Sequence, residues 1–227
     1  MSTLQQRLNT ILAQIHRAET LYQRPKNSVQ LLAVSKTKPA NAIAESYYAG
    51  QRHFGENYVQ EALQKQQALS AFDITWHFIG PIQSNKTKLL AGHFHWVHSV
   101  DSLKIAQRLN EQRPDYLPPL NICLQVNISE QDTKSGILLN QLADLVEQVL
   151  GLPRLNLRGV MAIPAPAHTI EQQRLPYRTL FNAVKQLNKP QLSTFSFGMS
   201  DDLEAAIAEG ATIVRIGTAL FGARNYN

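Results

Sequence analysis

The sequence alternates between short apolar runs typical of β-strands and amphipathic segments typical of helices. Strict alternation favours a parallel sheet, because parallel neighbours are joined by a crossover that is usually a helix. The apolar runs are expected to form eight strands over 29–34, 51–55, 74–80, 94–100, 120–128, 155–163, 192–198 and 212–217. Eight strand–helix units in about 200 residues predict a closed (β/α)8 (TIM) barrel. An open, doubly wound sheet is the alternative.

Apolar residues at helical spacing mark the connecting helices. Leu4, Leu8 and Ile11 recur every three or four residues, so 3–22 is expected to be an extra N-terminal helix. Helices between the strands are expected over 39–49, 57–69, 84–91, 101–112, a stretch around 137–149, 170–187 and 201–210. Because no linker, low-complexity segment or repeat interrupts this plan, residues 1–227 are expected to form a single domain.

Composition excludes several classes of protein. With 44% hydrophobic and 17% charged residues, the chain is too apolar to be disordered. No run approaches the ~20 apolar residues of a membrane-spanning helix, and the first residues lack the apolar core of a signal peptide. Cys123 is the only cysteine, so a reducing, cytoplasmic setting is expected.

Basic residues exceed acidic ones by five, and the whole excess lies in residues 1–38. Nucleic-acid binding would be expected to show a longer basic stripe interleaved with aromatic residues. A basic RNA-binding module is therefore disfavoured, and we expect neither a nucleic acid nor a membrane as a partner.

Lys36 lies at the expected end of the first strand, within AVSKTKP. Active sites of TIM barrels gather where strands end. Side-chain alternation places Lys36 on the same face as Leu32 and Val34, which suggests that its amine faces the barrel interior. A partly desolvated amine loses its proton more readily and can attack a carbonyl to form a Schiff base. The alternative is a lysine that extends to the surface.

The last strand carries an arginine where an apolar residue is usual, in VRIGTALFG at 214–222. Because arginine is rarely buried without an acceptor, Arg215 needs either a carboxylate or a ligand inside the protein. Gly217 and Thr218 follow at the strand tip and offer backbone N–H groups and a hydroxyl.

A second small, polar strand tip lies in FSFGMSDDLEAAI at 195–207. Gly198 allows close backbone approach, and Ser200 is expected to cap the following helix. The loops after strands seven and eight of TIM barrels commonly bind phosphate. Asp201 and Asp202 would repel a phosphate, so they are expected to point to solvent.

Other conspicuous residues have simpler interpretations. His77 is expected to be a core histidine with hydrogen-bond partners, and Cys123 a packing residue in mid-strand. His95 and His98 are three apart on a strand and so face opposite sides. No cluster has the spacing of metal ligands, so no metal site is expected.

Three expected features meet at one barrel mouth: a reactive lysine, two strand tips that can bind phosphate, and a fixed cation. Together they suit a ligand that carries an aldehyde, a phosphate and a hydrogen-bond acceptor. Pyridoxal 5′-phosphate (PLP) combines these groups. A phosphosugar enzyme that uses Lys36 as an aldolase-type lysine is an alternative from another class.

Six motifs, AVSKTKP, HFGENYVQE, HFIGPIQSNK, KSGI, FSFGMSDDLEAAI and VRIGTALFG, resemble those of the pyridoxal phosphate homeostasis proteins. That family is similar to the N-terminal barrel domain of alanine racemase, a fold type III PLP-binding barrel. The resemblance spans essentially the whole chain. It implies that the cofactor-binding residues are Lys36 for the Schiff base, Asn57 beside the cofactor, Ser200, Gly217, Thr218 and the backbone near Met199 at the phosphate, and Arg215 at the pyridine nitrogen.

The resemblance further implies that the protein binds, stores and supplies PLP in the cytoplasm, with apo PLP-dependent enzymes as recipients. Arg215 stays protonated and donates to the ring nitrogen without protonating it, so the ring is a weaker electron sink and robust racemisation is not expected. The chain ends at Asn227, which is expected to leave no room for the second domain of alanine racemase and to favour a monomer. The alternative is a racemase-like fold type III enzyme acting on an unidentified amine.

Lys38 and Lys134 have two interpretations. They are either ordinary surface charges or amines that capture the aldehyde when it leaves Lys36.

Overall fold

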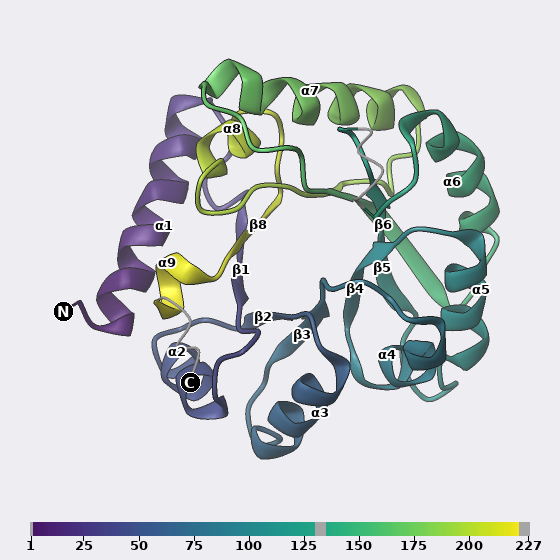
Figure 1. Ribbon diagram of the computed structural model, residues 1–227, viewed down its shortest axis with the longest axis horizontal. Helices are drawn as coiled ribbons and strands as arrows, with labels where there is room; N and C mark the ends of the chain where they lie inside the picture. Colours follow the sequence, from purple (N-terminus) through teal and green to yellow (C-terminus); the bar gives the residue numbers. More distant parts are fainter. Residues whose placement is uncertain (1, 130–134, 223–227) are drawn as a thin grey trace.

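In the computed structural model of this chain, which describes residues 2–129 and 135–222, eight parallel strands close into a barrel in sequence order. The strands are β1 (Gln30–Val34), β2 (His53–Glu56), β3 (Thr75–Phe78), β4 (Trp96–Val100), β5 (Leu120–Val126), β6 (Leu155–Ala162), β7 (Thr194–Ser196) and β8 (Ile213–Ile216). β1 pairs with both β2 and β8, which closes the ring (Figure 1). The closed barrel is confirmed, and the open sheet is excluded.

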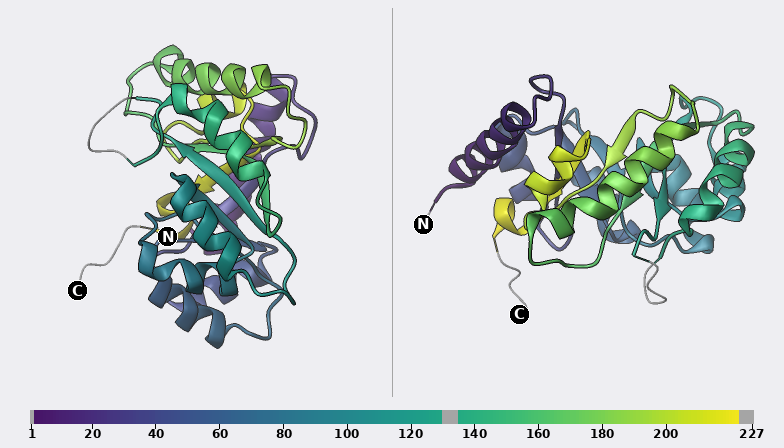
Figure 2. Two further views of the ribbon diagram at one scale, coloured as in Figure 1. Left: turned by 90° about the vertical axis from the view of Figure 1, so that its right-hand side faces the viewer. Right: turned by 90° about the horizontal axis from the view of Figure 1, so that it is seen from above.

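Helices surround the strands on the outside (Figures 1 and 2). They are α1 (Leu4–Leu21), α2 (Ala40–Tyr48), α3 (Val59–Ala68), α4 (Thr87–His93), α5 (Leu103–Gln112), α6 (Leu142–Leu150), α7 (Ile170–Gln186), α8 (Leu203–Ala208) and α9 (Thr218–Phe221), with 3-10 turns η1 (Ser84–Lys86) and η2 (Leu139–Gln141). Among the described residues, no helix is long and apolar enough to cross a membrane.

The extra helix α1 packs beside α8 and α9 (Figure 1). Arg7 Nε donates to the carbonyl oxygen of Leu220 at 2.6 Å, and the Arg24 guanidinium donates to the carbonyl oxygens of Ile207 and Ala211 at 2.9 and 3.0 Å. These carbonyls lie at or near the ends of two short helices, where acceptors are left over. Arg7 and Arg24, which belong to the basic excess in residues 1–38, thus have a structural role.

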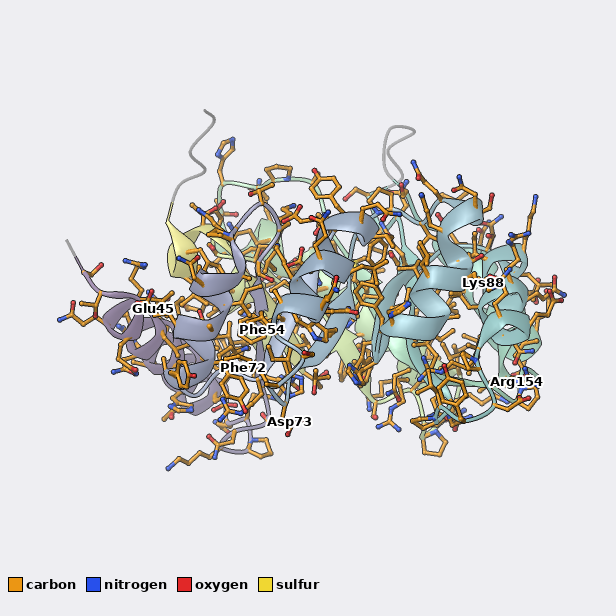
Figure 3. The ribbon with its side chains drawn as sticks, turned by 90° about the horizontal axis from the view of Figure 1, so that it is seen from below. Glu45, Phe54, Phe72, Asp73, Lys88 and Arg154 are labelled. Carbon is orange, nitrogen blue, oxygen red and sulfur yellow. The ribbon has the colours of Figure 1, made fainter. Side chains whose placement is uncertain are left out.

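The protein has two buried regions of different character. An apolar layer, which includes Leu31 and Phe54, fills the space between strands and helices. Figure 3 shows Phe54 inside the molecule, whereas Lys88 and Arg154 lie at its periphery. The barrel interior is instead strongly polar, as the contacts across it show below.

Two local differences from the predicted elements have clear causes. The second strand begins at His53 rather than 51, because the buried Gln51 side chain donates to the carbonyl oxygens of Leu31 and His53 at 2.9 and 2.7 Å. The side-chain amide of Gln51 thereby supplies hydrogen bonds in place of backbone pairing between strands at this position. The short helix α9 follows β8 where none was predicted, since four residues carry too little periodicity to detect.

Candidate functional site

Lys36 lies in the turn after β1, at the carboxyl end of the barrel, and is half-buried. Because Leu32 of β1 pairs with Arg215 of β8, the turns that follow these two strands are neighbours. They approach closely: a β-carbon on Gly217 would lie 3.2 Å from the carbonyl oxygen of Val34. The structure therefore brings Lys36, Arg215 and Gly217 to one end of the barrel.

An ion cluster of the buried Lys65 and Glu56 with the half-buried Glu61, here called the Lys65 cluster, holds the backbone beside Lys36. Lys65 Nζ donates to the carbonyl oxygen of Ser35 at 2.8 Å. It also pairs with Glu56 Oε1 at 2.8 Å and with Glu61 Oε1 at 2.5 Å. Since Ser35 directly precedes Lys36, the cluster fixes one side of the reactive turn.

The same carboxylates hold the other side. Thr37, in the left-handed region with φ of 63°, donates its N–H to Glu61 Oε1 at 2.6 Å. The Ser35 hydroxyl donates to Glu56 Oε1 at 2.6 Å. Burial raises the pKa of Glu56, against the opposing effect of the Lys65 charge. Both neighbours of Lys36 are thus held by side chains of β2 and α3.

The Lys65 cluster was not predicted from the sequence. The available signal was the spacing of Glu61 and Lys65, four residues apart in an expected helix. Such pairs usually lie on an exposed helix face, whereas Lys65 is only 6% exposed. Burial came from the packing of α3 against the end of β1, which local periodicity does not describe.

Arg215 is buried inside the barrel. Its Nη1 donates to the backbone carbonyl of Ser196 and, at 3.0 Å, to the hydroxyl of the same residue. Its Nη2 donates to the carbonyl oxygen of Ala162 at 3.0 Å. All three acceptors are neutral, and among the described residues no carboxylate pairs directly with Arg215, although the more distant Asp202 charge favours its protonated form. The alternative of a directly paired carboxylate is therefore wrong for the part of the chain that the structure describes.

Burial lowers the pKa of Arg215, yet guanidinium groups remain protonated in proteins because their ordinary pKa is so high. A buried cation without a counter-ion is costly. Among the described residues, none accepts a hydrogen bond from Arg215 Nε. The arginine is therefore suited to a ligand that carries an acceptor or a negative charge.

Asp202 organises the tip of β7. Its Oδ1 accepts from the N–H of Met199 at 2.6 Å, and its Oδ2 accepts from the hydroxyl of Tyr177 at 2.6 Å. The Tyr177 hydroxyl in turn accepts from the N–H of Gly198 at 3.2 Å. The expectation that Asp202 points to solvent is therefore wrong: its carboxylate holds this turn together.

Ser200 does not cap the helix that follows. α8 begins at Leu203 with Asp202 at the N-cap position, and Ser200 lies exposed in the preceding turn. The predicted cap is wrong because the Asp202 carboxylate draws the chain into a turn before the helix starts. Asp201 is exposed, as expected.

Asn57 follows β2 and lies beside a cavity of about 280 Å³. Gln125, Ser135 and Ile163 also line this cavity. The Asn57 Oδ1 atom is buried and has no hydrogen-bond partner among the described residues. Gly80 packs directly on this turn, where a β-carbon would lie 2.3 Å from the Asn57 carbonyl oxygen. An orphaned acceptor at the barrel mouth is the second feature that suits a polar ligand.

His77 is a core histidine with hydrogen-bond partners, which confirms its interpretation. Its Nε2 lies 3.1 Å from His53 Nδ1, and its Nδ1 lies 2.9 Å from His98 Nε2. Burial, reinforced by the neighbouring imidazoles, lowers the pKa of His77 well below its usual value. Burial likewise lowers the pKa of His98 to about 3. Both imidazoles are neutral near neutral pH.

Cys123 is fully buried in β5, and burial raises the pKa of its thiol to about 12. It is a packing residue, as predicted. His95 is exposed, whereas His98 faces the barrel interior, so the two lie on opposite sides as expected. In the part of the chain that the structure describes, no three His, Cys, Asp or Glu residues converge as metal ligands would.

The two further lysines differ in what the structure says of them. Lys38 is half-buried, and its Nζ donates to the carbonyl oxygen of Gly222 at 3.1 Å. Lys134 lies outside the described residues.

Comparison with known proteins shows which family this chain resembles. A family model described as "Alanine racemase, N-terminal domain" matches residues 8–225. The chain is 57% identical over 226 residues to the pyridoxal phosphate homeostasis protein of Pseudomonas aeruginosa, covering 100% of this chain and 98% of that protein. It is 52% identical over 232 residues to the Escherichia coli protein of the same name, covering 100% and 99% of the two chains.

Solved structures with a similar fold agree with these sequence comparisons. PipY from Synechococcus elongatus, solved with PLP bound, superposes with a TM-score of 0.80 at 40% identity, covering 92% of this chain and all of that one. Alanine racemase from Corynebacterium glutamicum gives a TM-score of 0.65 at 16% identity, covering 94% and 60%. The latter shows only a shared fold.

Proposed function

This chain belongs to the pyridoxal phosphate homeostasis protein family, and we propose that its barrel mouth binds PLP so as to store and supply it. The observation that carries the proposal is the buried Arg215, which pairs directly with no carboxylate among the described residues, at the same barrel end as the half-buried Lys36. When bound, the cofactor supplies an aldehyde that reacts with amines, a pyridine nitrogen and a phosphate.

The residues fit each of these groups. We assign the reactive amine to Lys36, whose turn is held on both sides by the Lys65 cluster. Arg215 Nε offers a donor for the ring nitrogen. Asn57, with its orphaned amide oxygen, borders the cavity beside the site.

The phosphate is proposed to lie between the tips of β7 and β8. Gly217 and Thr218 open α9, where the first N–H groups of a helix have no acceptor within it. Ser200 adds an exposed hydroxyl. The N–H of Met199 already donates to Asp202, so Met199 shapes the phosphate cradle without donating to it.

We propose that the protein carries the cofactor rather than catalyses a robust reaction such as racemisation. Arg215 holds its proton, so the ring nitrogen accepts a hydrogen bond and stays unprotonated. An unprotonated ring stabilises a carbanion less well than a protonated one. We further propose a monomer that delivers PLP to apo PLP-dependent enzymes.

Absorbance and mass spectrometry test the binding proposal. Protein mixed with PLP should show a visible absorption band that borohydride removes, and the peptide containing Lys36 should carry a pyridoxyl-phosphate adduct. Lys36→Ala should lose both, whereas Lys26→Ala, a change at another N-terminal lysine, should lose neither. An adduct absent from Lys36 in the wild-type protein would overturn the proposal.

A screen of amines separates the carrier from the alternative enzyme. PLP-loaded protein incubated with free amino acids should leave their enantiomeric composition unchanged. It should activate an apo PLP-dependent enzyme faster than the protein with reduced, permanently attached cofactor does. Multiple turnovers with any amine would favour the racemase-like alternative instead.

A further inference from the structure

Three histidines inside the barrel form a continuous row of hydrogen bonds that ends at Arg215. His53 Nδ1 lies 3.1 Å from His77 Nε2, and His77 Nδ1 lies 2.9 Å from His98 Nε2. His98 Nδ1 then lies 2.8 Å from the hydroxyl of Ser196. That hydroxyl accepts from Arg215 Nη1 at 3.0 Å. The row joins β2, β3, β4, β7 and β8, and its step from β4 to β7, which are not neighbours in the sheet, crosses the barrel interior.

Because most of the row is buried, its hydrogen-bond donors and acceptors must find their partners within the protein. His77, His98, Ser196 and Arg215 are all at most 4% exposed, and His53 is half-buried at the far end. His77 also stacks on the ring of Trp96, at 5.6 Å between centroids and 11° between planes. A neutral imidazole has one donor and one acceptor nitrogen, so adjoining histidines must all point their donors the same way.

The hydroxyl of Ser196 decides which way. Among the described residues its only side-chain partners are Arg215 and His98. Arginine has only donors, so Ser196 Oγ accepts from Arg215 and its own proton is left for His98. If His98 donated to Ser196 instead, the hydroxyl proton would be buried without an acceptor, which is unfavourable.

We propose that Ser196, His98 and His77 are positioning residues for Arg215, and that every hydrogen bond of the row points away from the arginine. Ser196 donates to His98 Nδ1, His98 Nε2–H donates to His77 Nδ1, and His77 Nε2–H donates to His53 Nδ1. The row thus keeps an oxygen lone pair aimed at Nη1 and fixes the guanidinium. Its relevance to PLP rests on the proposed function, whereas its direction does not.

Nuclear magnetic resonance tests the direction in protein without PLP. Long-range proton–nitrogen spectra of ¹⁵N-labelled protein distinguish protonated from unprotonated imidazole nitrogens, with His→Gln variants assigning the signals. His53, His77 and His98 should all be neutral at pH 7 with the proton on Nε2. A proton on His98 Nδ1 in the wild-type protein would overturn the proposal.

Two substitutions at one position test the positioning role. In His98→Gln the amide can still accept from Ser196 and donate to His77, whereas His98→Leu can do neither. PLP affinity should fall about tenfold in His98→Leu, the loss expected for one hydrogen bond in a buried network, and stay within about threefold of wild type in His98→Gln. His16→Gln, an exposed change on α1, should leave affinity unchanged.

The outcomes separate the two proposals. If His98→Leu is folded and binds PLP as tightly as wild type, the positioning role is wrong. If His98→Leu does not fold, an affinity loss of more than about threefold in folded His98→Gln would overturn it. If wild type itself binds no PLP, the proposed function fails, and the direction of the row is still decided by the spectra.

Discussion

Lys65 Nζ lies 2.8 Å from the carbonyl oxygen of Ser35, the residue directly before Lys36. Through this bond the Lys65 cluster on α3 and β2 holds the turn that carries the proposed reactive amine. Removing one partner of a buried ion pair leaves the other charge uncompensated. The turn at Lys36 is therefore coupled to the stability of the whole barrel.

Lys65→Met is expected to lower the free energy of unfolding by about 3–5 kcal/mol, because Glu56 would be left buried without its counter-ion. Urea unfolding followed by circular dichroism measures this change. The double variant Lys65→Met/Glu56→Gln should recover part of the loss, since the amide needs no counter-ion. A single variant within about 1 kcal/mol of wild type would show that the cluster contributes little, as exposed pairs do.

Gly198→Ala is expected to destabilise the protein by about 1–3 kcal/mol, because the backbone there has a φ of 84° that costs strain in alanine. The added β-carbon would also lie 2.5 Å from the β-carbon of Ala206. Gly92→Ala, inside α4 with nothing within 4 Å of the new carbon, should instead stabilise by about 0.5–1 kcal/mol. Thermal or urea unfolding compares the two, and equal effects would contradict this account.

The interior histidines are expected to make stability fall steeply in acid. Burial sets the pKa of His98 at about 3 and the pKa of His77 well below its usual value, so the unfolded chain binds more protons than the folded one below pH 6.5. Stability is therefore retained above pH 6.5 and lost as the pH falls towards the folded values, by up to about 1.4 kcal/mol per pH unit for each imidazole.

Urea unfolding between pH 7 and pH 4 measures this slope. His98→Gln should reduce it by about one imidazole's share. An identical slope in His98→Gln would mean that this histidine is protonated in the folded protein.

Cys123 is expected to resist thiol reagents in the folded protein. Burial both excludes the reagent and raises the pKa of the thiol to about 12, so the reactive thiolate is scarce. Labelling should be complete in denaturant, and in buffer its rate should follow global unfolding. Rapid stoichiometric labelling of folded protein would contradict the structure.

Much of the architecture could be inferred from the amino-acid sequence alone. Alternating periods of about two and 3.6 residues predicted eight strands and their helices. These are local properties, repeated along the chain, and they do not depend on which strands meet.

The partners of the site residues were decided by the folded barrel alone. The Asp202 carboxylate holds Met199 and Tyr177, although its charge beside the predicted phosphate site had suggested that it points to solvent. Likewise, His53, His77 and His98 belong to three strands and join in one row only once those strands lie side by side. Periodicity specifies which way a side chain faces, but a hydrogen bond between distant residues depends on strand register and on the closure of the sheet, which no local pattern encodes.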